Sequence, residues 1–290
     1  MAQVAEDIPL MKNQADLTPF IIERPLSDTS ISEIYEVSNP LGSLALAVKI
    51  AKPNLTSKEA LRIEAGLNPT IVSKHVLPVI SSGTIHQPAT RWNGLPYIVS
   101  PYVEGGTLQD QTVDDFASAK AAIKIIKDAA RGLRDIHAHG YVHCDVKARN
   151  IFVAEGVGFI GDLGSAVSYG DQAGAGNRGL HKKGLLGTLG YMSPEQITGK
   201  PMTASSDVFS LGVAAIYALT GHYPWAALEN EGTTIKQPVE EVSRVVLHGE
   251  FRESVPFYIP ATVNEMLHQC LEPDRDYRPT LEEIIELPLY

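Results

Sequence analysis

Short apolar runs with alternating polar positions dominate the chain from about residue 17 to about residue 102. Runs of this kind are typical of β-strands. They predict strands at 34–37, in "LALAVKI" (44–50), in "VLPVISSG" (76–83) and in "LPYIVSPYV" (95–103). One segment among them, "SKEALRIEAGL" (57–67), has helical spacing instead, and Ser57 is its expected N-cap.

Long segments with helical spacing replace the strand pattern after about residue 103. Three of them carry apolar residues every three or four positions: 116–140, 205–221 and 260–272. A strand-rich first third followed by a helical remainder predicts an α+β protein with two unequal lobes. We expect the lobes at about 17–102 and 103–290, after a loosely attached segment over 1–16.

Composition and charge narrow the choice of partners. The chain has 290 residues, 44% of them hydrophobic, which is enough for a substantial core. A net charge of -10 and a pI near 5.4 disfavour a nucleic acid or an anionic membrane as a partner, because both attract cationic surfaces. We expect no signal peptide and no membrane-spanning run, and two cysteines do not make a disulfide framework. These features favour a cytoplasmic location.

One polar cluster carries candidate chemistry. Asp145, Lys147 and Asn150 lie in "YVHCDVKARNIFV", between two apolar strand-like pieces, and Asp162 follows in "GDLG". One interpretation is a polar hairpin loop. The other is a phosphoryl-transfer set, with a carboxylate to accept a proton, a lysine and an amide beside it, and a second carboxylate for a hard cation. Mg²⁺ suits such a set, because it takes only one or two protein carboxylates together with phosphate oxygens.

The same residues make the chain resemble the eukaryotic-type protein kinases, and bacterial members in particular, over roughly residues 17–288. The family's H-R-D-x-K-x-x-N catalytic loop appears as "HCDVKARN" (143–150), and its D-F-G motif appears as "DLG" (162–164). The resemblance therefore covers almost the whole chain and includes its candidate catalytic residues.

Three further motifs follow in the family's order. "GTLGYMSPEQ" resembles the end of the activation segment, with Thr188 in the substrate-binding turn and Glu195 in the A-P-E position. The helical segment at 205–221 matches the long buried helix whose Asp207 ties down the catalytic loop. "PDRDYRPT" supplies Arg278, the family's partner for Glu195. Five motifs in the right order make a chance resemblance very improbable.

The resemblance implies a bilobal kinase fold and an activity. The γ-phosphoryl group of ATP would pass, with Mg²⁺, to a Ser or Thr hydroxyl of a protein substrate. Asp145 would accept the hydroxyl proton, Lys147 would stabilise the transferring phosphoryl group, and Asn150 and Asp162 would hold Mg²⁺. Two alternatives stay open, namely a pseudokinase that acts as a nucleotide-binding or scaffold module, and a kinase-like enzyme for small molecules.

The resemblance also assigns nucleotide-binding residues. Lys49 in "LALAVKI" takes the place of the α/β-phosphate lysine, with Glu64 as its partner or Glu59 on the same helix as the alternative. The other implied residues are Ile34 and Phe152 on the two sides of adenine, Ala47 in its roof, Ser100 as the gatekeeper, and Pro101 and Val103 in the hinge. Proline is tolerable in that hinge position, because adenine needs only its carbonyl group there.

The expected phosphate-covering hairpin, "LSDTSISEIYEV", is the main departure from the family. Ser27, Thr29 and Ser32 stand where the family has glycines. A left-handed conformation at these residues would cost on the order of 1 kcal/mol, which predicts weaker ATP binding. Asp28 at the tip would also repel phosphate if its carboxylate pointed toward the site.

Cys144 is a second departure. It replaces the arginine that, in many members of the family, meets a phosphorylated activation loop. Without that cation, activation by phosphorylation of the loop is not expected. The neighbouring carboxylate of Asp145 raises a thiol pKa, which favours a structural cysteine over a redox sensor.

Overall fold

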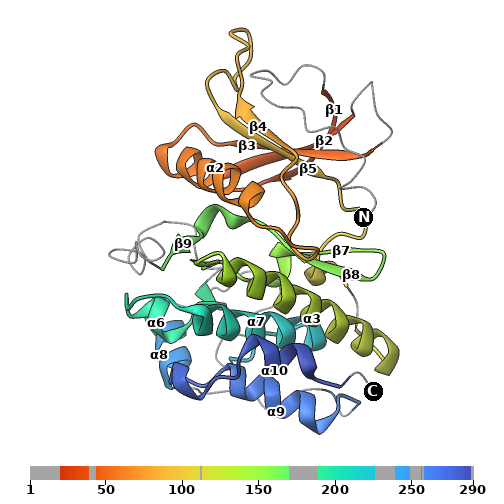
Figure 1. Cartoon of the computed structure of the whole chain (residues 1–290), viewed down its shortest axis with the longest axis vertical. Coiled ribbons are helices and arrows are strands. Elements are labelled where there is room, and N and C mark those ends of the chain that lie inside the picture. Colours follow the sequence, from red (N-terminus) through yellow and green to blue (C-terminus); the bar gives the residue numbers. More distant parts are fainter. Residues whose placement is uncertain are drawn as a thin grey trace. The chain divides into compact units, whose positions relative to one another are not determined.

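The computed structural model of the chain describes residues 20–38, 44–111, 113–169, 189–225, 239–248, 256 and 258–288. The segment predicted at 1–16 lies outside these residues. The chain divides into two compact units (Figure 1). The sheet unit comprises the residues up to Glu104 together with Asp162–Ser165, and the helical unit comprises Gly105–Gly161 and the residues from Ala166 onward. The predicted α+β class is confirmed, since strands dominate the first unit and helices the second.

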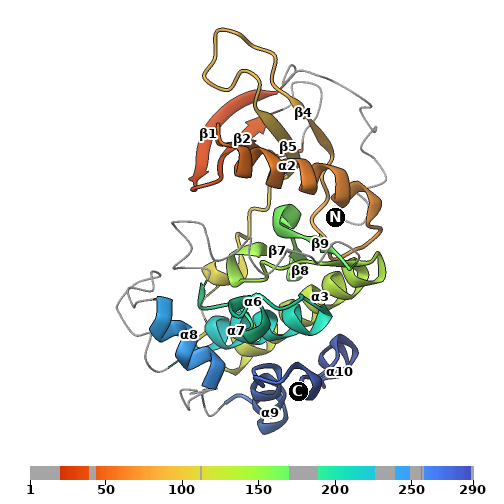
Figure 2. The same ribbon diagram turned by 90° about the vertical axis from the view of Figure 1, so that its left-hand side faces the viewer.

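Antiparallel strands form the sheet of the first unit, in the order β1-β2-β3-β5-β4. The strands are β1 (Ile21–Asp28), β2 (Ser32–Ser38), β3 (Leu46–Ala51), β4 (Ser81–Thr84) and β5 (Pro96–Pro101). Helix α2 (Leu55–Leu67) lies against one face of this sheet (Figure 2). Pro25 lies on β1, which is an edge strand of the sheet. Edge strands tolerate proline, which has no N–H group to donate to a neighbouring strand.

Alternation along β3 divides its side chains between the two faces of the sheet. Val48 and Ile50 belong to the apolar cluster on one face, which includes residues of β2 and β5. Ala51 packs with Leu61 of α2 on the other face. Lys49 alternates with Val48 and therefore lies on the face that α2 covers.

The start of α2 differs from the prediction. The helix begins at Leu55, and its N-cap is Asn54, whose side chain accepts a hydrogen bond from the backbone N–H of Ser57. Ser57, the expected N-cap, is a buried residue inside the first turn. Asparagine caps a helix at least as well as serine, so the earlier residue takes the position.

The predicted strands at 34–37, 44–50 and 95–103 correspond to β2, β3 and β5, with ends shifted by one or a few residues. The strand expected at 76–83 is shorter, because β4 begins only at Ser81. Pro78 in the preceding segment has no N–H group for a strand ladder.

The helical unit is built on six α-helices within the described residues. They are α3 (Phe116–Ala138), α6 (Pro194–Ile197), α7 (Ala204–Thr220), α8 (Val239–His248), α9 (Ala261–Cys270) and α10 (Leu281–Glu286). Strand β6 (Tyr141–Val142) pairs with β9 (Val167–Ser168), and β7 (Ile151–Ala154) pairs with β8 (Val157–Ile160). The short 3₁₀ helices are η1 (Asn68–Thr70) and η4 (Leu163–Ser165) in the sheet unit, and η2 (Leu108–Asp110), η3 (Ala148–Asn150) and η6 (Arg275–Tyr277) in the helical unit.

Helix α7 is the central element of the helical unit and packs against both α3 and α9. Its approach to α9 requires a glycine, because a Cβ atom on Gly212 would lie 2.5 Å from the Cβ atom of Cys270. Although α7 is apolar, no helix in the described ranges combines the length and hydropathy needed to cross a bilayer.

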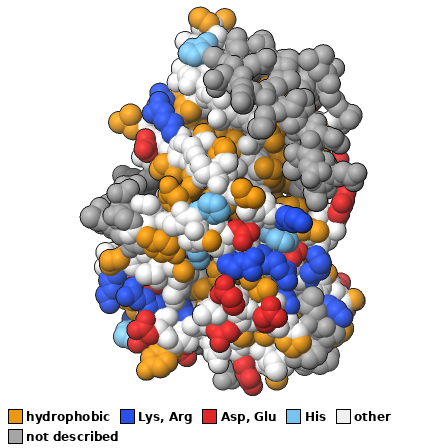
Figure 3. All heavy atoms as spheres, in the orientation of Figure 1, with side chains coloured by type: hydrophobic (Ala, Val, Ile, Leu, Met, Phe, Trp, Pro, Cys, Tyr) orange, Lys and Arg blue, Asp and Glu red, His pale blue; other side chains and the backbone are white. Residues whose placement is uncertain are grey.

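Two ion pairs join Asp128, a buried residue of α3, to basic residues of the same helix. Asp128 accepts from Lys124 at 3.0 Å and from Arg131 at 2.7 Å, at the i,i+4 and i,i+3 spacings that favour such pairs. In the space-filling view, basic and acidic side chains lie interleaved on the helical unit (Figure 3). Neither sign of charge therefore dominates this face.

Candidate active site

Lys49 on β3 binds two carboxylates within the sheet unit. Its Nζ atom lies 2.9 Å from Oε2 of Glu64 on α2 and 2.9 Å from Oδ1 of Asp162, just before η4. Glu64, rather than the alternative Glu59, forms this ion pair. The fold thus brings together three of the residues that the sequence predicts for phosphate and metal binding.

Burial and charge act in opposite directions on this cluster. Burial alone would lower the pKa of Lys49, but the carboxylates of Asp162 and Glu64 outweigh it and raise that pKa above its usual value. Burial raises the pKa of Glu64, and Lys49 and the backbone N–H of Leu163 oppose that shift. Lys49 is therefore held as a protonated ammonium group.

Asp162 adopts a left-handed backbone conformation, with a φ angle of 65°. Aspartate tolerates this conformation better than most residues. The turn leads into η4, which packs on α2 so closely that a Cβ atom on Gly164 would lie 3.1 Å from the carbonyl oxygen of Ala60. The packing of η4 on α2 places Asp162 beside Lys49.

The catalytic-loop residues form a second cluster, in the helical unit. Lys147 Nζ lies 2.7 Å from Asp145 Oδ2, and Asn150 Nδ2 donates to the backbone oxygen of Asp145 at 2.8 Å and to its Oδ2 at 3.2 Å. The backbone N–H of Gly161 donates to the carbonyl oxygen of Asn150 at 2.9 Å. Asn150 is therefore bonded to the residue that directly precedes Asp162.

Asp207 on α7 anchors this loop with one buried carboxylate. The backbone N–H groups of His143 and Cys144 donate to it at 2.8 and 2.9 Å, and His137 Nε2 lies 2.7 Å from its Oδ2. The motif resemblance implies the role of Asp207. The sequence analysis did not identify His137, because nothing local shows that this ring reaches a residue 70 positions away.

His143 is fully buried and supports the loop from inside. Its Nδ1 accepts from the backbone N–H of Asp145 at 3.2 Å, and its Nε2 lies 3.0 Å from the carbonyl oxygen of Gly161. This network assigns the proton to Nε2, which then donates to that carbonyl. Both ring nitrogens are used, so the ring positions the loop and is not a general base.

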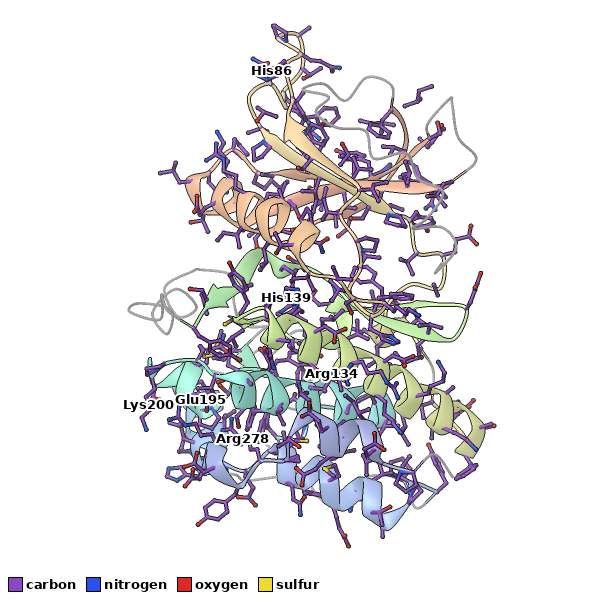
Figure 4. The ribbon with its side chains drawn as sticks, in the orientation of Figure 1. His86, Arg134, His139, Glu195, Lys200 and Arg278 are labelled. Atoms are coloured by element: carbon purple, nitrogen blue, oxygen red, sulfur yellow. The ribbon has the colours of Figure 1, made fainter. Side chains whose placement is uncertain are left out.

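Glu195 on α6 and Arg278 after η6 form a buried, two-pronged ion pair, with distances of 2.7 and 3.0 Å (Figure 4). Ser206 Oγ donates to the same carboxylate at 2.6 Å. Burial alone would raise the pKa of Glu195, but the hydrogen bond and charge of Arg278 lower it. This pair fixes the chain just beyond the predicted substrate-binding turn.

The residues before α6 are also held in place. Ser210 Oγ donates to the carbonyl oxygen of Tyr191 at 2.7 Å, and Trp225 Nε1 donates to that of Gly190 at 2.9 Å. Tyr191 itself is buried, and its ring lies edge-on against Tyr223. Thr188, predicted to lie in the substrate-binding turn, lies outside the described residues.

Three of the predicted adenine residues, Ile34, Ala47 and Ser100, share the face that carries Lys49. Ile34 pairs directly with Lys49, and Ala47 pairs with Ser100. Pro101 ends β5 opposite Leu46, and Val103 is 8% exposed. Phe152 lies on β7 in the helical unit, so its predicted stacking opposite Ile34 stays a prediction.

The hairpin tip between β1 and β2 is closed by its own threonine. Thr29 Oγ1 accepts from the backbone N–H groups of Ile31 at 3.3 Å and Ser32 at 3.0 Å, and donates to the carbonyl oxygen of Ser32 at 3.0 Å. Ser27, Thr29 and Ser32 all have negative φ angles, since the left-handed non-glycine residues of the described chain lie elsewhere. The predicted conformational penalty for replacing the glycines is therefore wrong, because this tip does not need a left-handed residue.

Asp28 does not point toward the Lys49 face. It pairs across the hairpin with Glu33, which alternates with Ile34 and so lies on the opposite face of the sheet. Its carboxylate binds Lys52 Nζ at 2.5 Å. The repulsion of phosphate that was considered for Asp28 does not follow from this orientation.

Comparison with known proteins agrees with the family that the clusters around Lys49 and Asp145 indicate. A model of the protein kinase domain matches residues 22–290. The chain belongs to the protein kinase domain family. The predicted resemblance and the predicted bilobal kinase fold are thereby confirmed.

The relatives of this kinase domain include bacterial enzymes. Serine/threonine-protein kinase PknB of Mycolicibacterium smegmatis is 36% identical over 192 residues, which cover 62% of this chain and 29% of that protein. PknB of Mycobacterium tuberculosis (strain H37Rv) is 35% identical over 191 residues, with the same coverage of 62% and 29%. Mitogen-activated protein kinase kinase kinase 17 of Arabidopsis thaliana is 26% identical over 270 residues, which cover 91% of this chain and 68% of that protein. The match spans less than a third of the PknB proteins.

The donor set fits the cofactors that protein kinases generally use, ATP and Mg²⁺. Asn150 and Asp162 offer an amide and a carboxylate oxygen, which are the ligand types that Mg²⁺ prefers. No cluster of three or more His, Cys, Asp or Glu ligands occurs among the described residues. The potential donors thus suit a cation that is bound largely by phosphate oxygens and water.

Cys144 occupies an apolar position in this kinase domain. It packs on the cluster of Val142, Val167 and Met202. Burial, followed by the nearby carboxylates of Asp207 and Asp145, raises the pKa of its thiol well above the usual value. These surroundings suit a small neutral side chain and support the structural interpretation of this cysteine.

Proposed function

We propose that this chain is an active protein serine/threonine kinase that transfers the γ-phosphoryl group of ATP, with Mg²⁺, to hydroxyl groups of protein substrates. The observation that carries the proposal is that the predicted catalytic residues of each unit form ion pairs with one another. Lys49 is bound to two carboxylates in the sheet unit, and Asp145 is bound to Lys147 in the helical unit. Phosphoryl transfer depends mainly on positioning and charge neutralisation, which these groups supply.

The catalytic roles follow from the chemistry of each group. Asp145 accepts the proton of the substrate hydroxyl, and Lys147 places a positive charge beside the transferring phosphoryl group. Lys49, braced by Glu64, orients the α- and β-phosphates. Mg²⁺, when bound, neutralises phosphate charge and is held by Asp162 and by Asn150, whose amide oxygen is the suitable atom because its nitrogen already donates to Asp145.

The remaining nucleotide contacts are proposed by family position. Adenine lies between Ile34 and Ala47 on one side and Phe152 on the other, and its edge meets the hinge. The hinge residues are Ser100 as gatekeeper, Pro101 and Val103, and the phosphates lie under the hairpin that contains Ser27, Thr29 and Ser32. Support comes from the shared face of Ile34, Ala47, Lys49 and Ser100 on the sheet.

The substrate is proposed to be a protein with an accessible Ser or Thr. The PknB relatives are named serine/threonine-protein kinases, and the buried Glu195–Arg278 pair holds the segment that follows the predicted substrate-binding turn. We further propose that Thr188 contacts Asp145 and Lys147, and that phosphotyrosine is not a product.

The domain limits and the location are proposed in the same way. The kinase domain spans 17–290, with lobes at about 17–102 and 103–290, which is supported by the division of the chain between Glu104 and Gly105. Two free cysteines, Cys144 and Cys270, suit a reducing compartment and support a cytoplasmic location.

A transfer assay tests the proposal. The purified chain is incubated with Mg²⁺ and γ-labelled ATP, with a generic basic protein as acceptor, and the products are located by mass spectrometry. We expect phosphoserine and phosphothreonine, and we expect Asp145→Asn to lower the rate at least about a hundredfold, because a general base contributes that much. Asp276→Asn is the matched control, since this carboxylate is 85% exposed.

Two outcomes would contradict the proposal. Absence of transfer by the wild-type chain, with ATP binding intact, would favour the pseudokinase alternative. Dominant phosphotyrosine would instead contradict the predicted substrate class.

A further inference from the structure

Lys52, which directly follows β3, makes three bonds to the phosphate-covering hairpin. Its backbone N–H donates to the carbonyl oxygen of Ile31 at the tip, at 2.9 Å. Its Nζ atom lies 2.5 Å from Oδ1 of Asp28, the last residue of β1, and 3.2 Å from Oε1 of Glu33 on β2. One residue thus holds the tip and both strands of the hairpin.

The two carboxylates that Lys52 binds are direct cross-strand neighbours. Asp28 and Glu33 form a pair in the register of β1 and β2. Like charges that face each other across a strand pair are destabilising. The ammonium group of Lys52 neutralises both, so its removal would leave two anions facing each other at the end of the hairpin that covers the phosphates.

Glu33 connects Lys52 to the rest of the sheet unit. Its Oε2 accepts from Tyr35 Oη at 2.8 Å, from Arg91 at 2.7 Å and from Trp92 Nε1 at 3.0 Å. Arg91 and Trp92 belong to the segment between β4 and β5. Charges alternate from Asp28 to Lys52, Glu33 and Arg91, so each carboxylate has a cation beside it.

The hairpin lacks the feature that would let it adapt around phosphates by itself. Its tip carries no glycine, and Thr29 Oγ1 occupies the backbone N–H groups of Ile31 and Ser32. A glycine-rich tip can change its φ and ψ angles freely, whereas hydrogen bonds of Thr29 Oγ1 close this tip. Its position over the nucleotide therefore depends on what holds the strands at their ends.

We propose that Lys52 is a positioning residue for the phosphates of ATP. Its bonds to Asp28, Glu33 and Ile31 hold the closed hairpin in the position in which it covers the phosphates bound at the Lys49 face. Lys52 itself extends from the opposite face, since it alternates with Ala51. It acts through the hairpin and not by contact with the nucleotide. This inference rests on the proposed kinase function and concerns ATP binding, which can be measured without phosphoryl transfer.

Titration calorimetry with Mg²⁺-ATP and with adenosine tests the inference. Lys52→Met keeps the aliphatic stem and removes the charge. We expect it to weaken ATP binding about three- to tenfold, as for the loss of a small ion-pair network, and to leave adenosine binding unchanged. In steady-state assays the same change should appear in KM for ATP, with kcat within about twofold.

Four variants serve as comparisons. Lys52→Arg should bind ATP as the wild type does, because it keeps the cation. Asp28→Asn breaks the Lys52–Asp28 bond from the other side and should also weaken ATP binding, and the double variant Lys52→Met with Asp28→Asn should bind no more weakly than Lys52→Met alone, because both changes break the same bond. Lys74→Met, which removes an exposed lysine from the same unit, should change nothing.

The outcomes separate this inference from the proposed function. Equal weakening of ATP and adenosine by Lys52→Met, or no weakening of either, would overturn the inference while leaving the kinase assignment intact. A double variant in which the losses from Lys52→Met and Asp28→Asn add in full would also overturn it. Conversely, the variants could show the expected changes in ATP binding while the wild-type chain transfers no phosphoryl group. That outcome would overturn the proposed function alone.

Discussion

Glu33 combines burial with four hydrogen-bond or ion-pair partners. Burial alone would raise its pKa, but the hydrogen bonds of Tyr35 and Trp92, with Lys52 and Arg91 beside them, lower the pKa from 4.5 to about 2. The side chain is 13% exposed, so solvent screens these interactions only in part. The ionised form of Glu33 is therefore preferred strongly in the folded state.

This shift predicts a pH-dependent contribution to stability. A depressed carboxyl pKa stabilises the folded state fully above the unfolded-state value and loses that effect as pH falls toward the folded-state value. We expect Glu33→Gln to lower the free energy of unfolding by up to roughly 3 kcal/mol at pH 7. The difference from the wild type should shrink between about pH 4.5 and pH 2.

Urea unfolding followed by Trp92 fluorescence measures this difference, in a Trp225→Phe background so that the signal comes from the sheet unit. Glu36→Gln on the same strand provides a control carboxylate. An equal effect of Glu33→Gln at pH 7 and at pH 3 would contradict the assignment of the shift to Glu33.

Cys144 leads to a second prediction at the residue scale. Its raised thiol pKa keeps Cys144 protonated at neutral pH, and its packing against an apolar cluster leaves it only partly exposed. Cys270 is 1% exposed, and burial raises its pKa to about 12. Since the thiolate is the reactive form, we expect both thiols of the native chain to react with iodoacetamide at least about tenfold more slowly than in guanidinium chloride.

Mass spectrometry of the alkylated peptides distinguishes the two sites. Rapid modification of Cys144 in the folded chain would show that it is exposed and activated, and would revive the redox-sensor interpretation.

At the scale of elements, the backbone of the β1–β2 hairpin differs from what the sequence predicted for its tip. The sequence predicted weaker ATP binding because Ser27, Thr29 and Ser32 replace glycines that could adopt a left-handed conformation. The structure shows no left-handed residue to relieve at these positions, and it shows a tip closed by Thr29 Oγ1. Glycine would remove that closure and increase the conformational freedom of the free hairpin.

We therefore expect Thr29→Gly to weaken ATP binding about three- to tenfold, which corresponds to a loss of roughly 1 kcal/mol. Thr29→Ser keeps the hydroxyl group and should bind as the wild type does. Both can be compared by titration calorimetry with Mg²⁺-ATP. Tighter binding by Thr29→Gly would show that the closed tip hinders the nucleotide.

Helix α2 shows why element boundaries need more than a local pattern. The apolar spacing locates the helix, and the polar residues Asn54 and Ser57 both suit its start. Which of them is the cap depends on where the chain leaves β3. The observed cap, Asn54, lies three residues before the predicted one, Ser57. The predicted partner of Lys49, Glu64, is nevertheless on the buried face of the helix.

At the scale of the whole molecule, the Glu195–Arg278 pair joins parts of the helical unit that lie 83 residues apart in sequence. Arg278 also donates to the carbonyl oxygens of Glu272, Pro273 and Ser205, and its side chain is fully buried. The guanidinium group lies 4.9 Å from the ring centroid of Phe209. A buried charge with this many partners tolerates little change.

Arg278→Met should leave the carboxylate of Glu195 buried without its cation. We expect a loss of about 3–5 kcal/mol of stability, seen as a lower midpoint in thermal unfolding, together with a loss of kinase activity. Arg278→Lys should rescue poorly, because an ammonium group does not reproduce the two-pronged geometry. Arg275→Met is the control, since this side chain is 46% exposed. A normal unfolding midpoint for Arg278→Met would show that the pair contributes little.

Much of the architecture was predictable because its signals are local. Alternating and helical periodicity identified β2, β3, β5 and the long helices, and motif spacing identified the polar residues of the catalytic loop. The predicted roles of Asp145, Asn150 and Asp162 stay predictions, although the fold places the first two in hydrogen-bond contact. The misplaced cap arose where Asn54 and Ser57 fit the local pattern equally well, and β4 is shorter because Pro78 before it has no N–H group for a strand ladder.

The amino-acid sequence by itself determined the order of chemical groups, the strand that carries Lys49, and the family to which the chain belongs. Tertiary structure alone decided that His137 reaches Asp207, that Asp28 faces Lys52 rather than the Lys49 face, and that Thr29 closes the hairpin tip. Periodicity and motifs report which residues are neighbours along the chain. Contacts between distant residues depend on packing and strand register, which exist only in the folded chain.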